Sequence, residues 1–386
     1  MRHLPRLPIV PGLPIWAIRL LLRPWFLCAA GLALMVGAAS AQTATATEGN
    51  GTQQFGDIGD LKLVNGQVLR ACRVGYRAFG RLDASKSNVV LFPTWFGGSA
   101  ANLADLIGPG KLIDSSRYYV IAVDALANGV STSPSNSPTQ PRLRFPEIGI
   151  RDMVASQHAL LTKVLHIPHV RAVMGISMGG MQTFQWILAH PTFMDRAVAI
   201  AGSPQLAPYD LLLWQSELDA IFSDPEWKGG DYTKQPLLRA VQEIQDLALT
   251  TPEHYNRVNT RQTFLAGIAK RVPPTLDAND RVRQLQAMVH HDVAAPAATP
   301  FGGSLAKAAA QVKASLLVVV EPRDHMVTPG PALEFAAAAR ARVLKTDTDC
   351  GHLAPSCEGE AIGAAISEHL ADPGRATTRP GAERSK

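Results

Sequence analysis

The sequence predicts an α/β fold in which helices flank a mostly parallel sheet. Short apolar runs rich in Val and Ile recur along the chain, and helical stretches separate them. Such runs are typical of strands that are buried on both faces of a sheet. They lie at Val89–Phe92, Tyr118–Val123, Val170–Met174, Ala197–Ala201 and Leu316–Val320. The 386 residues are 46% apolar and 18% charged, which excludes disordered, collagen-like and coiled-coil chains.

The first 41 residues have the pattern of a secretory signal peptide. Arg19 and Arg23 precede the apolar run Trp25–Ala39, and Ala39-Ser40-Ala41 provides the small residues that a signal peptidase requires. The alternative is an uncleaved anchor helix extended backwards through Ile15–Leu22, but the two arginines interrupt it. We therefore expect cleavage after Ala41, a periplasmic or secreted protein, and no stable membrane insertion after cleavage.

The charge balance argues against a nucleic-acid partner. The formal charge is +5, but four of the 37 Lys and Arg residues lie in the first 41 residues, where no Asp or Glu occurs. The remaining chain carries 33 basic residues against 32 acidic ones, so the expected mature protein is nearly neutral. His290-His291-Asp292 is a poor metal signature, and we interpret it as a solvated helix end. We predict neither a metal nor a cofactor.

The remaining segments follow from composition and periodicity. We expect a flexible leader over 42–55 and a disordered tail over 371–386. Between them, the fold occupies 56–203 and 314–370. Leu61–Val64 and Val68–Phe79 predict a β-hairpin around Asn65-Gly66, because this dipeptide tolerates the positive φ angles of a tight turn.

A helical insertion without strand signal is predicted over 204–313, and we expect it to act as a lid. Its helices are predicted at Leu211–Phe222, Gln235–Leu249 and Arg281–Val289. Those of the surrounding fold are predicted at Asp152–Leu165, Met178–Ala189 and Cys357–Leu370.

The candidate nucleophile is Ser177, in the pattern Gly175-Ile176-Ser177-Met178-Gly179-Gly180. A serine on a sharp turn between a strand and a helix needs small neighbours, because the two backbones crowd there. A phosphate loop would require Lys followed by Ser or Thr, and a dinucleotide loop would require Gly-x-Gly-x-x-Gly; neither is present. The pattern therefore predicts a serine nucleophile.

A serine nucleophile needs a histidine base and a carboxylate that orients it. Asp324 follows the strand at Leu316–Val320, and we predict that it is the acid. Glu321 is a weaker candidate, because Pro322 follows it and we expect it still to lie in the strand. His352 follows a candidate strand at Ala341–Lys345, and we predict that it is the base. The chain order Ser, acid, His is that of serine hydrolases of the α/β class.

Two further features belong to the predicted site. The backbone N–H groups of Trp95 and Met178 are the candidate oxyanion donors, and Trp95 and Phe96 also have the character of residues that pack beneath the insertion. Cys350 and Cys357 flank His352, and export to an oxidising compartment favours a local disulfide between them. The alternative is that these two and Cys72 are buried thiols.

The sequence resembles the homoserine O-acetyltransferase-like branch of the α/β-hydrolase fold. The resemblance rests on Gly175–Gln182, on Asp152-Met153-Val154, on the segments 124–129 and 131–136, and on 224–232. It covers roughly residues 60–370. It implies the α/β-hydrolase fold with a lid, a covalent acyl-enzyme at Ser177, and support from His352 and Asp324.

The chain departs from the transferases at two places. Their His is followed by an Asp that holds the amino group of homoserine, whereas Leu353 stands here. Their loop after the third strand reads His-Ala-Leu-Thr-Gly, whereas this chain has Pro93-Thr94-Trp95-Phe96-Gly97. Moreover, an exported enzyme would rarely meet acetyl-coenzyme A.

We therefore predict a secreted serine hydrolase for a small-molecule ester, thioester or lactone with a sizeable apolar part. An O-acyltransferase is the alternative, and an inactive protein that captures a hydrophobic ligand is a third hypothesis. A homodimer is compatible with the sequence, which gives no signal for oligomeric state.

Overall fold

The computed structural model describes residues 47–268 and 276–372. The predicted signal peptide, and nearly all of the predicted tail, lie outside these ranges. The described residues after Thr43 belong to one compact unit.

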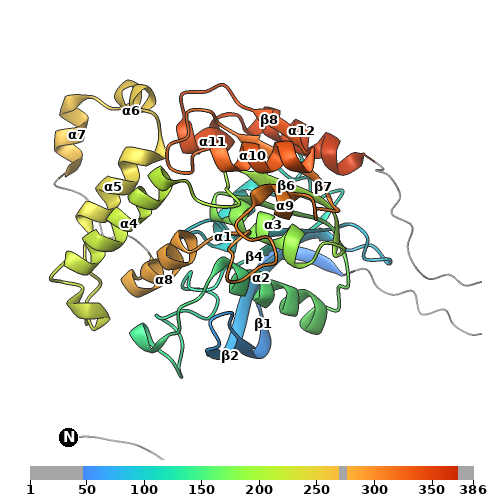
Figure 1. The fold of residues 1–386 in the computed structure, drawn as a ribbon, viewed down its shortest axis with the longest axis horizontal. Helices are drawn as coiled ribbons and strands as arrows, with labels where there is room; N and C mark the ends of the chain where they lie inside the picture. Colours follow the sequence, from blue (N-terminus) through green and yellow to red (C-terminus); the bar gives the residue numbers. More distant parts are fainter. Residues whose placement is uncertain (1–46, 269–275, 373–386) are drawn as a thin grey trace, which may run out of the picture. The chain divides into compact units, whose positions relative to one another are not determined.

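The core is an eight-stranded sheet in the order β1-β2-β4-β3-β5-β6-β7-β8 (Figure 1). β1 and β2 are antiparallel, β2 is antiparallel to β4, and every other neighbouring pair is parallel. The strands are β1 (Glu48–Lys62), β2 (Val68–Arg81), β3 (Val89–Pro93), β4 (Tyr119–Val123), β5 (Val170–Ile176), β6 (Met194–Ile200), β7 (Ser315–Val320) and β8 (Arg342–Lys345). The mostly parallel sheet predicted from the apolar runs is confirmed.

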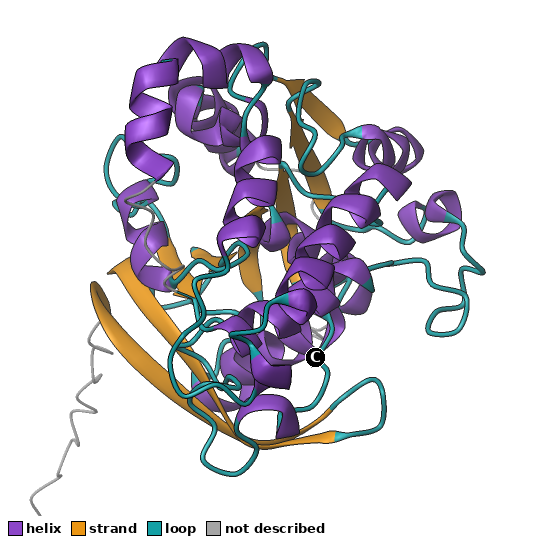
Figure 2. Ribbon diagram, turned by 90° about the vertical axis from the view of Figure 1, so that its left-hand side faces the viewer, coloured by secondary structure: helices purple, strands orange, loops and turns teal. Residues whose placement is uncertain are grey.

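Alternate residues of the central strands belong to two different apolar clusters. In β3, Val89 and Leu91 join one cluster, whereas Val90 and Phe92 join the other. Both clusters are buried because helices cover both faces of the sheet (Figure 2). The central strands are therefore continuously apolar, as strands covered on both faces must be.

The helices around the sheet lie between successive strands, except for α11 and α12, which follow β8. They are α1 (Ala100–Leu103), α2 (Ile150–Ala159), α3 (Met178–Ala189), α9 (Leu305–Ala309), α10 (Gly330–Ala339), α11 (Ala354–Cys357) and α12 (Gly359–Ala371). A π-helical turn at Leu160–Val164 continues α2, so this segment is helical over nearly the predicted length. α3 has the predicted bounds.

The segment between β6 and β7 is helical, and Figure 1 shows α4 to α7 gathered at one side of the molecule. Besides α9, its α-helices are α4 (Pro208–Ser223), α5 (Arg239–Leu249), α6 (Pro252–Val258), α7 (Arg261–Ile268) and α8 (Ala278–Val289). In its described part it contains one isolated bridge, Gln205 with Asp292, and no named strand. That this helical insertion acts as a lid remains a prediction. Within the described ranges, no helix has both the length and the apolar character that crossing a membrane requires.

The expected flexible leader is wrong over most of its length. Residues from Glu48 onward form β1, which pairs with β2 from Glu48↔Arg81 to Lys62↔Val68. The strand is polar because it lies at the edge of the sheet, where side chains such as Gln53 bond to neighbours instead of filling a core. Arg77 donates to the carbonyl of Gly51 and to the Gln53 side chain. The predicted hairpin is present, but its turn spans five residues between the paired Lys62 and Val68.

His291 also differs from the predicted solvated helix end. Helix α8 ends at Val289, His290 is exposed, and His291 is buried. The His291 Nε2–H group donates to the carbonyl of Ser203 at 3.0 Å. Burial lowers the pKa of His291 from 6.5 to about 3, so the folded protein holds this imidazole neutral.

This buried imidazole predicts a loss of stability in mild acid. Between pH 6.5 and about 3 the unfolded chain binds a proton at His291 that the folded chain does not, so stability falls as the pH falls through this window. The contribution reaches about 2 kcal/mol near pH 5. Urea unfolding of the wild type and His291→Gln, near neutral pH and near pH 5, measures the difference. Equal pH dependence in the two proteins would contradict the assignment.

Candidate active site

Ser177 lies on a sharp turn between β5 and α3. Its backbone has φ 56° and ψ −122°, a conformation that non-glycine residues rarely adopt. The turn brings two backbones together: a Cβ on Gly175 would lie 2.1 Å from the carbonyl oxygen of Gly179. A Cβ on Gly179 would lie 2.6 Å from the carbonyl oxygen of Pro93. Steric crowding therefore explains the glycines on both sides of the serine.

The structure brings Ser177, His352 and Asp324 together. His352 Nε2 lies 2.8 Å from Ser177 Oγ, and His352 Nδ1 lies 2.7 Å from Asp324 Oδ2. All three residues are at least 93% buried, with exposed fractions of 7%, 7% and 4%. Because a carboxylate accepts from Nδ1–H, Nε2 is left to accept the Ser177 hydroxyl proton. This is the arrangement that a serine nucleophile and its base require.

Asp324 lies in the loop that follows β7. Its Oδ1 accepts the backbone N–H groups of Met326 at 2.9 Å and Val327 at 3.1 Å, which leaves Oδ2 for His352. Glu321 lies immediately after β7, one position beyond the strand in which we expected it. Its Oε2 accepts from Thr346 Oγ1 at 2.7 Å and from Thr348 N at 3.2 Å. Glu321 therefore braces the chain leading to His352, and Asp324 is the carboxylate that meets the imidazole.

The loop that carries His352 is held at several points. The predicted disulfide between Cys350 and Cys357 is confirmed. Asp349 accepts from the guanidinium of Arg257 on α6, with an N–O distance of 2.7 Å, and lies 3.1 Å from His254 Nδ1. No motif identified Asp349, Arg257 and His254 in the sequence, because ion pairs between distant surface segments leave no local pattern.

The backbone N–H groups of Trp95 and Met178 remain the predicted oxyanion donors. Trp95 follows β3 by two residues, and Met178 is the first residue of α3. In the part of the chain that the structure describes, the Trp95 amide donates no hydrogen bond, and the first amides of a helix have no partner within it. Both N–H groups are thus available to an anion.

The Trp95 loop is held from two sides. Gln182 on α3 donates Nε2–H to the carbonyl of Thr94 at 3.0 Å, and Gln284 on α8 accepts the N–H of Gly97 at 2.8 Å. Phe96 packs edge-on against Trp214 of α4, with ring centroids 5.7 Å apart. The prediction that this aromatic pair packs beneath the insertion is confirmed for Phe96. The contributions of Gln284 and Trp214 are long-range, so the sequence alone gave no signal for them.

The remaining cysteine and metal-type groups offer little chemistry. Cys72 is free and buried, and burial raises the pKa of its thiol to about 12. His254, Asp349 and Cys350 bring possible ligand atoms within 4.8 Å of one another. The Cys350 sulfur is bonded to Cys357, however, and cannot act as a thiolate ligand.

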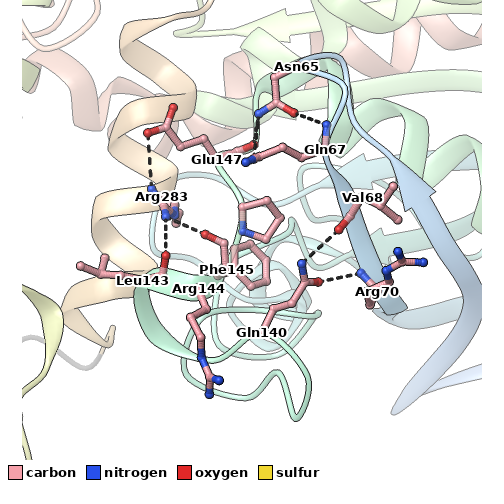
Figure 3. A pocket seen from close by; sticks show the side chains of 11 residues that line it. Asn65, Gln67, Val68, Arg70, Gln140, Leu143, Arg144, Phe145, Glu147 and Arg283 are labelled. Carbon is pink, nitrogen blue, oxygen red and sulfur yellow. Dashed lines mark hydrogen bonds and ion pairs between the residues drawn. The ribbon is translucent and has the colours of Figure 1, made fainter.

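A cavity of about 760 Å³ lies between the β1–β2 turn, residues 140–147 and α8 (Figure 3). None of the three residues of the Ser177 site lines it. Its Arg283 donates to the carbonyl of Phe145 at 2.6 Å, and its Gln140 bonds to the backbone of Val68 and Arg70. These contacts show that its polar side chains hold the 140–147 segment against the hairpin.

Comparisons of the sequence and the structure with known proteins point to the same family. Residues 88–355 match the family model described as the alpha/beta hydrolase fold. An ethyl acetate hydrolase of Pseudomonas veronii is 31% identical over 73% of this chain and 83% of its own length. A homoserine O-acetyltransferase of Methanococcoides burtonii is 29% identical over 70% of this chain and 62% of its own. The solved structure of the acetyl esterase MekB superposes with a TM-score of 0.75 at 29% identity, covering 83% of this chain and 96% of that one.

Because the disulfide holds the loop that carries His352, we expect its loss to lower activity more than stability. Cys350→Ser should cost about 2 kcal/mol of unfolding free energy, near the low end for disulfides, because the closed loop is short. Turnover should fall by a larger factor, since the loop presents the imidazole to Ser177. Thermal unfolding and kcat on an ester substrate measure the two effects, with Cys357→Ser as the matched variant. Free thiols at both positions in non-reduced peptides, or wild-type kcat in both variants, would refute this role.

Proposed function

Because the chain belongs to the α/β hydrolase fold family, we propose that it is a secreted serine esterase that cleaves an ester, thioester or lactone through a covalent acyl-enzyme. Ser177 is the nucleophile, His352 the general base, and Asp324 the carboxylate that orients the histidine. The observation that carries the proposal is the hydrogen-bonded series from Ser177 Oγ through His352 to Asp324. The kinship with esterases and homoserine O-acetyltransferases supports the reaction class.

Acylation begins when Ser177 Oγ attacks the carbonyl carbon of the substrate and its proton passes to His352 Nε2. The carbonyl oxygen becomes an oxyanion, which the N–H groups of Trp95 and Met178 stabilise. Asp324 stabilises the imidazolium that forms. The carbon–oxygen bond to the leaving alcohol then breaks, and the alcohol departs with the proton from Nε2.

Deacylation repeats these steps with water as the attacking group. His352 Nε2 takes a proton from water, the hydroxide oxygen attacks the acyl carbon, and the same amides hold the second oxyanion. The bond to Ser177 Oγ breaks, Oγ regains the proton, and the free acid leaves. The names of the relatives support a small acyl group such as acetyl, so we choose an acetyl ester for the assays below.

The environment of the histidine favours water over homoserine as the acyl acceptor. The residue after His352 is Leu353, whose side chain offers no carboxylate for a primary ammonium group. Burying an unpaired ammonium costs several kcal/mol. Asp231, the alternative carboxylate on the insertion, has 87% of its side chain exposed and pairs with Arg142. Transfer to an amino-alcohol acceptor is the second candidate function, and the transferase relatives favour it.

Export is the other part of the proposal. The Cys350–Cys357 disulfide supports an oxidising compartment, because such bonds are rare in proteins that stay in a reducing cytosol. Cleavage after Ala41 would remove the four arginines of the predicted signal peptide. The mass of the protein recovered from a periplasmic or culture fraction tests this directly, since an intact N-terminus would contradict cleavage.

Removing the nucleophile should abolish turnover and leave the fold intact. Ser177→Ala should lower kcat on p-nitrophenyl acetate by about 10⁴-fold to 10⁶-fold, and His352→Ala should be about as severe. Asp324→Asn should be somewhat milder. Circular dichroism checks that each variant folds. A folded Ser177→Ala protein that retains activity would refute the assignment.

The hydrolase and transferase readings differ in their product. With p-nitrophenyl acetate and millimolar homoserine, we expect free acetate as the main product and acetyl-homoserine lower by up to a few orders of magnitude. Leu353→Asp should raise the yield of acetyl-homoserine, because it supplies the missing carboxylate beside His352. Leu353→Asn is the uncharged control and should not. Acetyl-homoserine as the main product of the wild type would favour the transferase instead.

A further inference from the structure

We propose that Asp210 is a positioning residue for the reaction, holding the loop that carries Asp324 from the first helix of the insertion. The inference rests on the proposed function, because it assigns Asp210 a role through the carboxylate that orients His352. Nothing in the motif or in the comparisons distinguishes this residue.

The contacts of Asp210 join two segments that are far apart in the sequence. Asp210 is the third residue of α4 and is fully buried. Its Oδ2 accepts the N–H of Ala207 at 3.2 Å, which caps the helix, whereas its Oδ1 accepts the N–H of Thr328 at 3.0 Å. The Thr328 side chain also helps to lower the pKa of this carboxyl, against the larger effect of burial, which raises it. One side chain therefore joins the start of α4 to the end of the loop between β7 and α10. We call this loop, residues 321–329, the acid loop because it carries Asp324.

Two carboxylates accept three successive amides of the acid loop. Asp324 Oδ1 accepts the amides of Met326 and Val327, and the next bonded amide along the loop, that of Thr328, goes to Asp210. Without Asp210, the Thr328 amide would lose its acceptor at a partly buried site, and the loop would gain freedom next to Asp324. A misplacement of about 1 Å of a catalytic group can cost about 100-fold in rate.

Placing the Asp210 carboxylate close to Asp324 costs electrostatic free energy, which a helix cap far from another carboxylate would not cost. Burial raises the pKa of Asp210, and the nearby negative charge of Asp324 raises it further. A second carboxylate so close to the triad acid is unfavourable unless its hydrogen bonds compensate. Those bonds come from the acid loop and from α4, which supports a role in joining them.

Asp152 is a matched control for the capping part of this role. It is the third residue of α2, is 3% exposed, and accepts the N–H of Gly149 at 2.8 Å. It also accepts the N–H of Val64, at the β1–β2 turn, at 2.9 Å. Asp152 thus makes the same two kinds of bond in a part of the fold that does not contain the triad.

The test is a double-mutant cycle between Asp210 and Asp324. Two rates are measured: phosphonylation by a fluorophosphonate, and kcat on p-nitrophenyl acetate. Each rate is divided by the concentration of active enzyme, which the final extent of fluorophosphonate labelling gives, so that it is a rate per competent site. Asp210→Ala should lower both rates by about 10-fold to 100-fold with little change in KM. In an Asp324→Asn background, Asp210→Ala should lower the two rates by less than about 3-fold, because Asp210 acts on the reaction through Asp324. Asp152→Ala should lower the melting temperature and leave the rate per site unchanged.

Asp210→Asn separates the two contacts. Its amide oxygen can still accept from Thr328, while its NH₂ group faces the N–H of Ala207, so the cap is lost and the loop contact kept. We expect a lower melting temperature with most of the rate per site retained.

Three results would overturn the inference: an equal cost of Asp210→Ala in both backgrounds, a wild-type rate per site in Asp210→Ala, or an equal loss of rate in Asp152→Ala. If Asp324→Asn alone keeps the full rate, the proposed triad itself fails. A different outcome is that Asp324→Asn lowers the rate and Asp210→Ala lowers it further by the same factor as in the wild type. That outcome contradicts only the role of Asp210.

Discussion

The backbone of Ser177 is the constraint on which the rest of the site depends. A residue at φ 56° and ψ −122° costs free energy, of order 1–3 kcal/mol, and persists only where its surroundings enforce it. Here the enforcing elements are the buried strand β5 and the helix α3, which approach so closely that Gly175 cannot carry a Cβ. The end of β3 excludes a Cβ on Gly179 in the same way. The strain turns Oγ toward His352 and leaves the first amides of α3 free. Nucleophile and oxyanion donor thus follow from one turn.

The partners of that serine come from loops, and the helical insertion holds them. Asp210 of α4 binds the loop of Asp324, while Arg257 and His254 of α6 bind Asp349 in the loop of His352. Gln284 of α8 binds the loop of Trp95 through Gly97. Each of these three loops therefore has a polar contact to the insertion. A change in the insertion would reach the acid, the base and the oxyanion donor together.

Much of this arrangement is predictable from the sequence, for a physical reason. Strands buried on both faces must be apolar, and a serine on a crowded turn must have glycine neighbours, so β3 to β7, α3 and Ser177 leave local patterns. The family resemblance also predicted the α/β-hydrolase fold. Most of β1 was missed because an edge strand is stabilised by backbone pairing and tolerates polar residues such as Gln53. His291, Asp210 and the Asp349 cluster were missed because their roles depend on contacts across tens of residues, which no local pattern encodes.

The central claim, a covalent acyl-enzyme on Ser177, is tested most directly by trapping it. The purified protein is mixed with p-nitrophenyl acetate, quenched in acid during the first turnovers, digested and analysed by mass spectrometry. We predict a burst of p-nitrophenol close to one equivalent per competent site, with the acetyl group on the peptide that contains Ser177. Hydrolysis without a burst and without acetylation of that peptide, or acetylation at another residue that accounts for turnover, would contradict the account.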